Sequence, residues 1–281
     1  MVIGDEQAAR HYLANVGYYR LAGYWWPMQA DKTNHIFKAD STFEKVVALY
    51  GFDRELRLLL FDVIERVEIG VRTRINYHLS REVSPWWFEE ANLFKNTQLH
   101  EEALNAIDAE LARAKEVFIK EHYRKYTSDN RRPPAWKTLE VTSFGNISKL
   151  YGNLNPWVAA KNTVAYELGV VNHTYLPSWL QSISQIRNIC AHHGRLWNRN
   201  LPGRPKLLPN PPNPWLTNVP SMPEHHKLYV QLCCMKYLLN VISPGNSFGQ
   251  RLSLLLEKYP TVDKNALGIA DNWQKEPLWS E

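Results

Sequence analysis

The chain has 281 residues, of which 44% are hydrophobic and 12% aromatic, so it can bury a full core and is not intrinsically disordered over its bulk. Its formal net charge of +5 permits nucleic-acid binding without demanding it. The N-terminus shows no signal-peptide pattern, and no apolar stretch reaches the roughly 18 residues of a membrane span. We therefore expect a cytoplasmic protein that does not bind a membrane.

Helix signals recur along the first part of the chain, whereas strand signals are scarce. A helix-like segment covers Glu6 to Asn15, and Ser41-Thr-Phe-Glu44 has the form of a capping box. A long helix, or a broken pair of helices, is predicted from there to about Ser80. Its apolar stripe has three- or four-residue spacing and consists of Leu56, Leu60, Val63, Val67 and Val71.

The rest of the chain continues this helical pattern. Helices are predicted over Asn96 to Tyr126, Ala135 to Leu154, Lys161 to Gly169, Leu228 to Ile242, and Phe248 to Tyr259. A further helix is predicted to start near Thr174, with an apolar stripe formed by Trp179, Ile183, Ile186 and Cys190. Eight of the seventeen prolines fall in residues 200–223, which predicts an extended proline-rich loop. The pattern indicates an all-α helical bundle that forms a single domain over residues 1–281.

The segment Gln185 to Arg199 has the most distinctive composition. It holds Arg187, Asn188, His192 and His193, and it lies inside a window, Leu168 to Pro223, that contains no Asp or Glu. RNA cleavage needs a base, an acid, and a cation beside the phosphorane oxygens. Histidine moves protons near neutral pH because its ordinary pKa is about 6.5, and arginine offers a planar fork that matches phosphate. The segment therefore favours RNA as substrate, with no metal and no cofactor.

Metal and nucleotide sites find little support in the sequence. The three cysteines, Cys190, Cys233 and Cys234, show no Cys-x2-Cys spacing. The histidine pairs at 192–193 and 225–226 have no carboxylate or thiolate at ligand spacing. No Gly-rich phosphate loop is present, so a nucleotide-transferring enzyme is not indicated.

Arg187-Asn188 followed by His192 matches the Arg-x4-His pattern of HEPN ribonucleases. The surrounding Cys-Ala-His-His and Arg-Leu-Trp-Asn-Arg resemble bacterial abortive-infection proteins of the Abi/AbiD/AbiF kind. Further segments that resemble this family occur in its order along nearly the whole chain: Gly17 to Tyr24, Ile64 to Glu68 with Val71 to Arg74, Pro134 to Gly145, and Gly268 to Trp279. Family members usually carry a further stretch before the Tyr-Tyr-Arg segment.

The resemblance implies a HEPN-type helical core with family-specific additional helices. It also implies a metal-independent endoribonuclease that acts in antiphage abortive infection or as the toxin of a toxin-antitoxin pair. Arg187 would stabilise the phosphorane, His192 would act as general acid or base, and Asn188 would position one of them. For some members, a cognate noncoding RNA is the antitoxin.

Six further residues are expected to contact RNA: His193, Arg195, Asn198, Arg199, Arg204 and Lys206. Each also has a structural explanation. Imidazoles suit the negative end of a helix, here with Gly194 as the stop, and arginines after a helix end can be solvated loop charges. The rival function is an RNA-binding protein without catalysis that sequesters a noncoding RNA.

Two other groups of residues have competing explanations. The charged face on the long helix (Glu65, Arg66, Glu68, Arg72 and Arg74) is expected to be structural, whereas the resemblance makes these residues partners of the motif arginines. The aromatic set Tyr18, Tyr19, Tyr24, Trp25 and Trp26 is expected to pack in the core, with base stacking as the alternative.

The spacing of the motif has a geometric consequence. Successive helical residues turn by about 100°, so Arg187 and His192 lie about 140° apart around the axis. Bringing both to one phosphate requires a break in the helix near residues 191–194 or a second copy of the motif across a two-fold axis. HEPN ribonucleases use the second arrangement, so we expect a homodimer.

Overall fold

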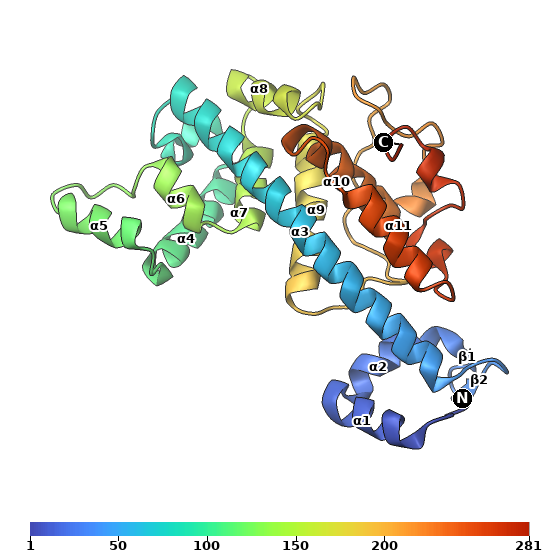
Figure 1. The fold of residues 1–281 in the computed structure, drawn as a ribbon. Coiled ribbons are helices and arrows are strands. Elements are labelled where there is room, and N and C mark those ends of the chain that lie inside the picture. Colours follow the sequence, from blue (N-terminus) through green and yellow to red (C-terminus); the bar gives the residue numbers. More distant parts are fainter. Residues whose placement is uncertain (281) are drawn as a thin grey trace.

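The structure is a computed structural model that describes residues 1–280. One 40-residue helix, α3 (Phe43–Glu82), runs through it and contacts most of the other helices (Figure 1). At 1.5 Å per residue it is about 60 Å long. All five residues of the predicted apolar stripe are buried on it. The long helix is therefore confirmed as one unbroken element.

The capping box predicted at Ser41 is wrong by one position. Thr42 is the N-cap, and its hydroxyl accepts a hydrogen bond from the Lys45 backbone at 3.3 Å. The other two residues hold the preceding chain instead: the Ser41 hydroxyl donates to the Met28 carbonyl, and the Glu44 carboxylate accepts from the Gly4 backbone at 3.0 Å. Tertiary contacts of the N-terminal segment have overridden the local capping pattern.

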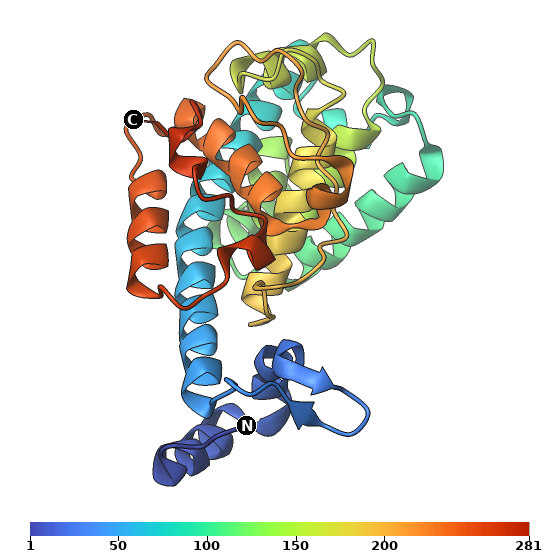
Figure 2. The same cartoon turned by 90° about the vertical axis from the view of Figure 1, so that its right-hand side faces the viewer.

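An N-terminal unit, residues 1–42, sits at one end of α3 (Figure 2). It contains α1 (Glu6–Val16), α2 (Tyr18–Trp25), the 3-10 turn η1 (Trp26–Met28), and a short antiparallel hairpin of β1 (Gln29–Asp31) and β2 (Ile36–Phe37). Gly17 joins α1 to α2 with φ of 89°, a backbone conformation that favours glycine. The helix α1 was predicted, whereas the hairpin was not.

The middle of the chain forms a helical layer at the other end of α3. Its elements are η2 (Trp87–Glu89), η3 (Ala91–Leu93), α4 (Thr97–Arg113), α5 (Val117–Lys125), α6 (Ala135–Val141), α7 (Phe144–Asn153) and α8 (Ala159–Glu167). The helices predicted over 96–126 and 135–154 are each wrong as single elements. The backbone becomes extended at Ala114 and Glu116 in the first and at Thr142 in the second, so each divides into two shorter helices.

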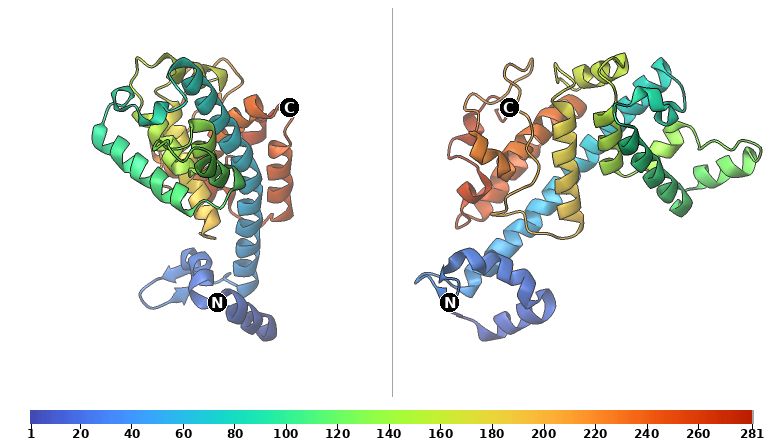
Figure 3. Two further views of the ribbon diagram at one scale, coloured as in Figure 1. Left: turned by 90° about the vertical axis from the view of Figure 1, so that its left-hand side faces the viewer. Right: turned by 180° about the vertical axis from the view of Figure 1, so that it is seen from behind.

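The C-terminal part begins with α9 (Leu176–Ala191), and its later helices pack against α3 beside α9, as the view from behind shows (Figure 3). It also contains η4 (Met222–His226), α10 (Leu228–Ile242), α11 (Phe248–Lys258), η5 (Lys264–Leu267) and η6 (Trp273–Lys275). The proline-rich loop is confirmed, with η4 beginning at its end. The loop nevertheless packs against α9, because Trp215 is 6% exposed and stacks on Trp179 with ring centroids 5.6 Å apart.

The all-α prediction is confirmed, because the hairpin is the one sheet among the described residues. Within the same residues, each helix is too short or too polar to cross a membrane.

A buried arginine joins α3 to the break between α6 and α7. Arg72 donates to the carbonyls of Leu139 and Thr142 and to the carboxylate of Glu68. Leu139 lies in the last turn of α6 and Thr142 is its C-cap, so Arg72 supplies donors to carbonyls at the helix end, where the regular helical hydrogen bonds stop. The Glu68–Arg72 pair is thus structural, as expected for this charged face.

We expect Arg72→Met to lower the free energy of unfolding by about 2–4 kcal/mol, because it leaves buried acceptors and a carboxylate without their donor. Arg66→Met is the matched control. Arg66 pairs with Asp62 at 2.5 Å, but both side chains are more than a third exposed, so its loss should cost under about 1 kcal/mol. Urea unfolding monitored by circular dichroism measures both, and equal losses would contradict the assignment.

Candidate active site

The helix that carries the Arg-x4-His motif, α9, is buried on one side. Trp179, Ile183, Ile186 and Cys190 are each at most 1% exposed, which confirms the predicted apolar stripe. They pack towards α3, α7 and α10. Burial raises the pKa of the Cys190 thiol to about 12, so this cysteine is a packing residue and not a thiolate at neutral pH.

Arg187 lies on the exposed side of α9, next to α3. It lines a cavity of about 510 Å³ together with Glu65 and Glu68. Its side chain makes no hydrogen bond or ion pair with any other residue in the described part of the chain. Neither glutamate forms an ion pair with Arg187 within residues 1–280, and Glu68 is bound to Arg72. Arg187 therefore keeps a free guanidinium at the surface.

Asn188 faces a different hollow. It lines a cavity of about 520 Å³ with Ser143 and Lys149, on the side of α7. His192 is exposed at the C-cap of α9, with its backbone N–H donating to the Asn188 carbonyl at 3.0 Å. No hydrogen bond joins the side chains of Arg187, Asn188 and His192 in the described structure. A single chain thus presents the three motif side chains separately around the end of one helix.

The helix ends in a two-bond cap centred on His193. Its N–H donates to the Cys190 carbonyl at 3.0 Å, and the Gly194 N–H donates to the Ile189 carbonyl at 2.7 Å. The left-handed residue of this cap is His193, with φ of 54°, so Gly194 is not the stop as predicted. Space at Gly194 is nevertheless tight, because a Cβ there would lie 3.0 Å from the Ile189 side chain and 3.2 Å from the Ile189 carbonyl oxygen.

A left-handed histidine is strained and must be held by its surroundings. Arg20 of α2 donates to the His193 carbonyl at 2.6 Å, and Arg57 of α3 donates to the Gly194 carbonyl at 3.3 Å. Two arginines from elements far away in sequence thus fix the turn that follows His192.

Asp53 of α3 anchors the next residues. Its carboxylate is fully buried and accepts from the backbone N–H groups of Leu196 and Trp197, the latter at 2.7 Å. It also accepts from the Arg57 guanidinium at 2.5 Å and the Tyr24 hydroxyl at 2.8 Å. Burial, together with the nearby Asp53 charge, raises the pKa of Tyr24, so its hydroxyl remains a donor.

The roles of Asp53, Arg57 and Arg20 were not predicted from the sequence. One signal was present: Asp53 and Arg57 form a four-residue pair on the face of α3 that otherwise holds Phe52, Leu56 and Leu60. An acid and an arginine on an apolar face indicate a buried pair. The backbone groups that donate to Asp53 lie 143 and 144 residues further along the chain, so no local sequence pattern indicates them.

The residues predicted to contact RNA fall into two groups. His193 and Arg199 are exposed near the end of α9, and Asn198 is partly exposed, with φ of 50°. Arg195 is half-buried, and its guanidinium donates to the carbonyls of Trp197 and Asn198. Its main role in this structure is therefore to hold the loop.

Arg204 and Lys206 are exposed on the proline-rich loop, which runs back along α9. The Lys206 carbonyl accepts from the Trp179 indole N–H, and the Lys206 backbone N–H donates to the hydroxyl of Ser178, in the first turn of that helix. Fourteen helical residues separate Ser178 from His192, a rise of about 20 Å. Lys206 is therefore far from the Arg-x4-His motif, at the opposite end of α9.

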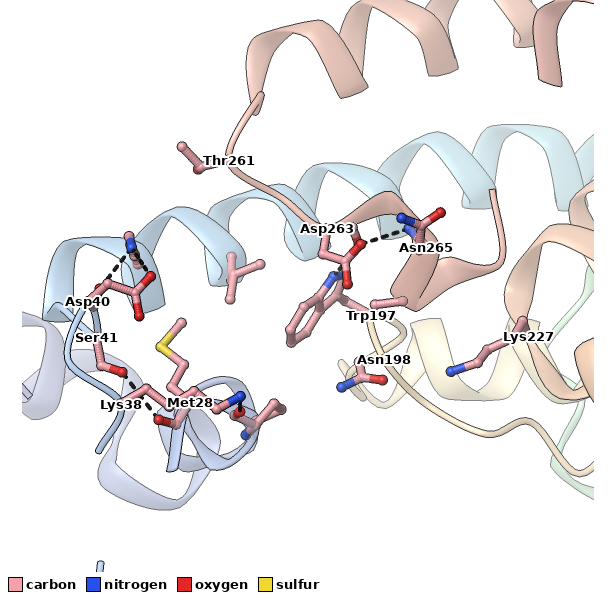
Figure 4. A pocket seen from close by; sticks show the side chains of 14 residues that line it. Met28, Lys38, Asp40, Ser41, Trp197, Asn198, Lys227, Thr261, Asp263 and Asn265 are labelled. Carbon is pink, nitrogen blue, oxygen red and sulfur yellow. Dashed lines mark hydrogen bonds and ion pairs between the residues drawn. The ribbon is translucent and has the colours of Figure 1, made fainter. Parts of the chain in front are cut away.

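A cleft of about 560 Å³ adjoins Asn198, between the N-terminal unit and the rest of the molecule (Figure 4). Lys38 and Asp40 line it from the N-terminal unit, and Lys227 and Asp263 from the opposite side. The side chains that line this cleft therefore include both positive and negative charges. Across residues 1–280, no group of three or more His, Cys, Asp or Glu side chains is arranged to hold a metal ion.

We expect Asp53→Asn to lower the free energy of unfolding by about 3–5 kcal/mol, because it leaves Arg57 buried without a counter-charge. Asp62→Asn is the matched control, because Asp62 also pairs with an arginine four residues later but is 37% exposed. That change should cost under about 1 kcal/mol. Urea unfolding of both variants measures the difference, and a loss at Asp53 as small as that at Asp62 would refute the anchoring role.

Comparison with known proteins bears on the same elements. The family model of Abi-like proteins matches residues 11–198, which is more than half of the chain. The match takes in α2, α3 and α9, the elements that the Asp53 contacts join, together with the Arg-x4-His motif; the segment Gly268 to Trp279 lies outside it. No curated protein and no solved structure matches the chain. The chain belongs to the Abi-like protein family, and this membership implies a role in abortive infection, a defence function.

Proposed function

We propose that this chain is a metal-independent endoribonuclease of the HEPN type and that it acts in abortive infection by cutting RNA. The observation that carries the proposal is the state of the motif side chains. Arg187 is exposed and has no bonded partner, and His192 is exposed at the end of the same helix. A free arginine and a solvent-accessible imidazole are the groups that phosphodiester cleavage needs.

The roles follow from the chemistry of each side chain. The Arg187 guanidinium stabilises the negative charge that builds on the phosphorane oxygens. His192 moves a proton, either from the attacking 2′-hydroxyl or to the leaving 5′-oxygen. Asn188 positions one of these groups or the phosphate. Attack of the 2′-oxygen on phosphorus expels the 5′-oxygen, so the products are a 2′,3′-cyclic phosphate and a 5′-hydroxyl.

The complete site requires two chains. Regular helix continues to Ala191, and the left-handed turn comes only at His193, after the motif has ended. Arg187 and His192 thus keep the roughly 140° separation of a regular helix. This favours a two-fold pair of chains in which one motif faces the other. A cognate noncoding RNA as restraining partner belongs to the same proposal.

Wild-type protein is expected to cleave RNA in excess EDTA and to leave 2′,3′-cyclic phosphate and 5′-hydroxyl ends. His192→Ala should lose roughly 100-fold or more in rate, since general acid–base catalysis contributes about 10²–10⁴-fold. His11→Ala serves as a matched control, because His11 is also an exposed histidine on a helix but lies outside the motif. End-group analysis of the products measures the chemistry, and 5′-phosphate ends or a strict need for Mg²⁺ would contradict it. RNA bound by wild type and by His192→Ala alike, with no cleavage by either, would favour the non-catalytic RNA-binding protein.

A mixed dimer tests the composite site. Titrating the double variant Arg187→Ala/His192→Ala into wild type should reduce activity more steeply than dilution. A mixed dimer has only one of the two arginines and one of the two histidines of the composite site. Light scattering should give the mass of a dimer, alone or with RNA. A monomer whose activity tracks only the wild-type chains, whatever the amount of variant added, would end the composite-site idea.

A further inference from the structure

Three consecutive residues at the start of α2 are exposed to solvent: Tyr18, Tyr19 and Arg20. Tyr18 is 58% exposed and Tyr19 is 92% exposed, whereas Tyr24 and Trp25 of the same helix are buried. The prediction that this aromatic set packs in the core is thus correct for the latter two and wrong for Tyr18, Tyr19 and Trp26. A tyrosine that is 92% exposed contributes little to folding, so its ring is available for a ligand.

The two tyrosine rings are braced against each other. Tyr18 meets Trp25 edge-on with centroids 5.1 Å apart, and Tyr19 stands perpendicular to Tyr18 at 5.5 Å. Tyr18 therefore rests on the buried core through Trp25 and supports Tyr19 from one side. A ring held in this way loses less conformational entropy when it stacks on a ligand.

Arg20 ties these rings to the motif helix. Its Nη1 donates to the carbonyl of His193, and no other described residue engages its guanidinium. Figure 2 shows α2 just beyond the end of α9. The Arg20 guanidinium is thereby placed beside the residue that follows His192, and Tyr19 is its neighbour in the chain.

The charged side chains near Tyr19 and Arg20 favour the binding of an anion. Arg20 and Arg199 are exposed near this end of α9, together with the imidazoles of His192 and His193. The carboxylate that reaches this turn, Asp53, is fully buried and already accepts hydrogen bonds from Arg57, Tyr24 and two backbone groups. Arg20 and Arg199 each donate to a backbone carbonyl but pair with no carboxylate among the described residues. An aromatic ring beside such cations is the arrangement that binds single-stranded nucleic acid, in which bases stack and phosphates pair with arginine.

We propose that Tyr19, braced by Tyr18, stacks on an unpaired base of RNA next to the scissile bond, and that Arg20 binds the adjoining phosphate. This subsite rests on the proposed ribonuclease function and specifies its substrate as single-stranded RNA. In an A-form duplex the faces of the bases are covered by their neighbours, so a duplex offers Tyr19 nothing to stack on. Tyr19 and Arg20 are binding residues here and take no part in proton transfer.

The test measures RNA binding separately from cleavage. Full-length His192→Ala protein is titrated with a single-stranded oligoribonucleotide containing 2-aminopurine, and anisotropy and fluorescence quenching are recorded. Adding Tyr19→Ala should weaken binding roughly 5- to 150-fold, which corresponds to one lost stacking contact. It should also abolish the quenching. Tyr19→Trp should retain both, and a duplex of the same sequence should bind with equal affinity to all variants.

Tyr166→Ala is the matched control, since Tyr166 is 73% exposed on α8, outside this surface. Its RNA affinity should equal that of the parent. Because Tyr19 is so exposed, Tyr19→Ala should also keep the parent's melting temperature, which excludes misfolding as the cause of weak binding.

The possible outcomes separate this subsite from the proposed function. If wild type cleaves RNA and Tyr19→Ala changes neither KM nor affinity, the ribonuclease stands and the stacking subsite is wrong. If Tyr19→Ala weakens binding as expected but wild type never cleaves, the subsite stands and the ribonuclease is wrong. Unchanged RNA binding with a lower molar mass would assign Tyr19 to a contact between chains and overturn the proposal, as would wild type that binds no RNA.

Discussion

The arrangement of this molecule depends on one buried carboxylate. Asp53 receives hydrogen bonds from α2, from its own helix α3, and from the backbone that follows α9. Without these donors, a fully buried charge would be strongly unfavourable, so they specify how the three elements meet. The turn at His193 is left-handed and strained, and it is held by Arg20 and by Arg57, the partner of Asp53. The position of the candidate catalytic helix end thus follows from a contact that is itself not catalytic.

Much of the fold could be predicted from local sequence, because helical periodicity is a local property. The stripe Leu56 to Val71 marked α3, and Trp179 to Cys190 marked the buried side of α9. Arg187 interrupts that stripe next to Ile183 and Ile186, and the structure places it at the exposed edge of the helix. Breaks inside a pattern were harder to predict, since Ala114 and Thr142 carry no strong helix-breaking signal, although the backbone is extended at both.

The surroundings of the site could not be predicted in the same way. Arg20 bonds a carbonyl 173 residues away, and any exposed arginine would look the same in the sequence. The resemblance identified Arg187, Asn188 and His192, but it assigned no role to the Tyr-Tyr-Arg segment that lies beside them. Tyr24 and Tyr19 are distinguished only by their tertiary contacts: the Tyr24 hydroxyl is bonded to Asp53, whereas Tyr19 is exposed to solvent. Both occur in one short helix of similar residues.

The contacts around Trp197 also determine when the turn can be completed during synthesis. Its backbone bonds Asp53, which emerges from the ribosome early, while its indole N–H donates to the carbonyl of Asp263 at 3.1 Å. Residue 263 is translated well after Trp197. A nascent chain therefore carries Arg187 and His192 long before the turn beside them has all its supports. A truncated product that ends before residue 263 lacks the acceptor of the Trp197 indole.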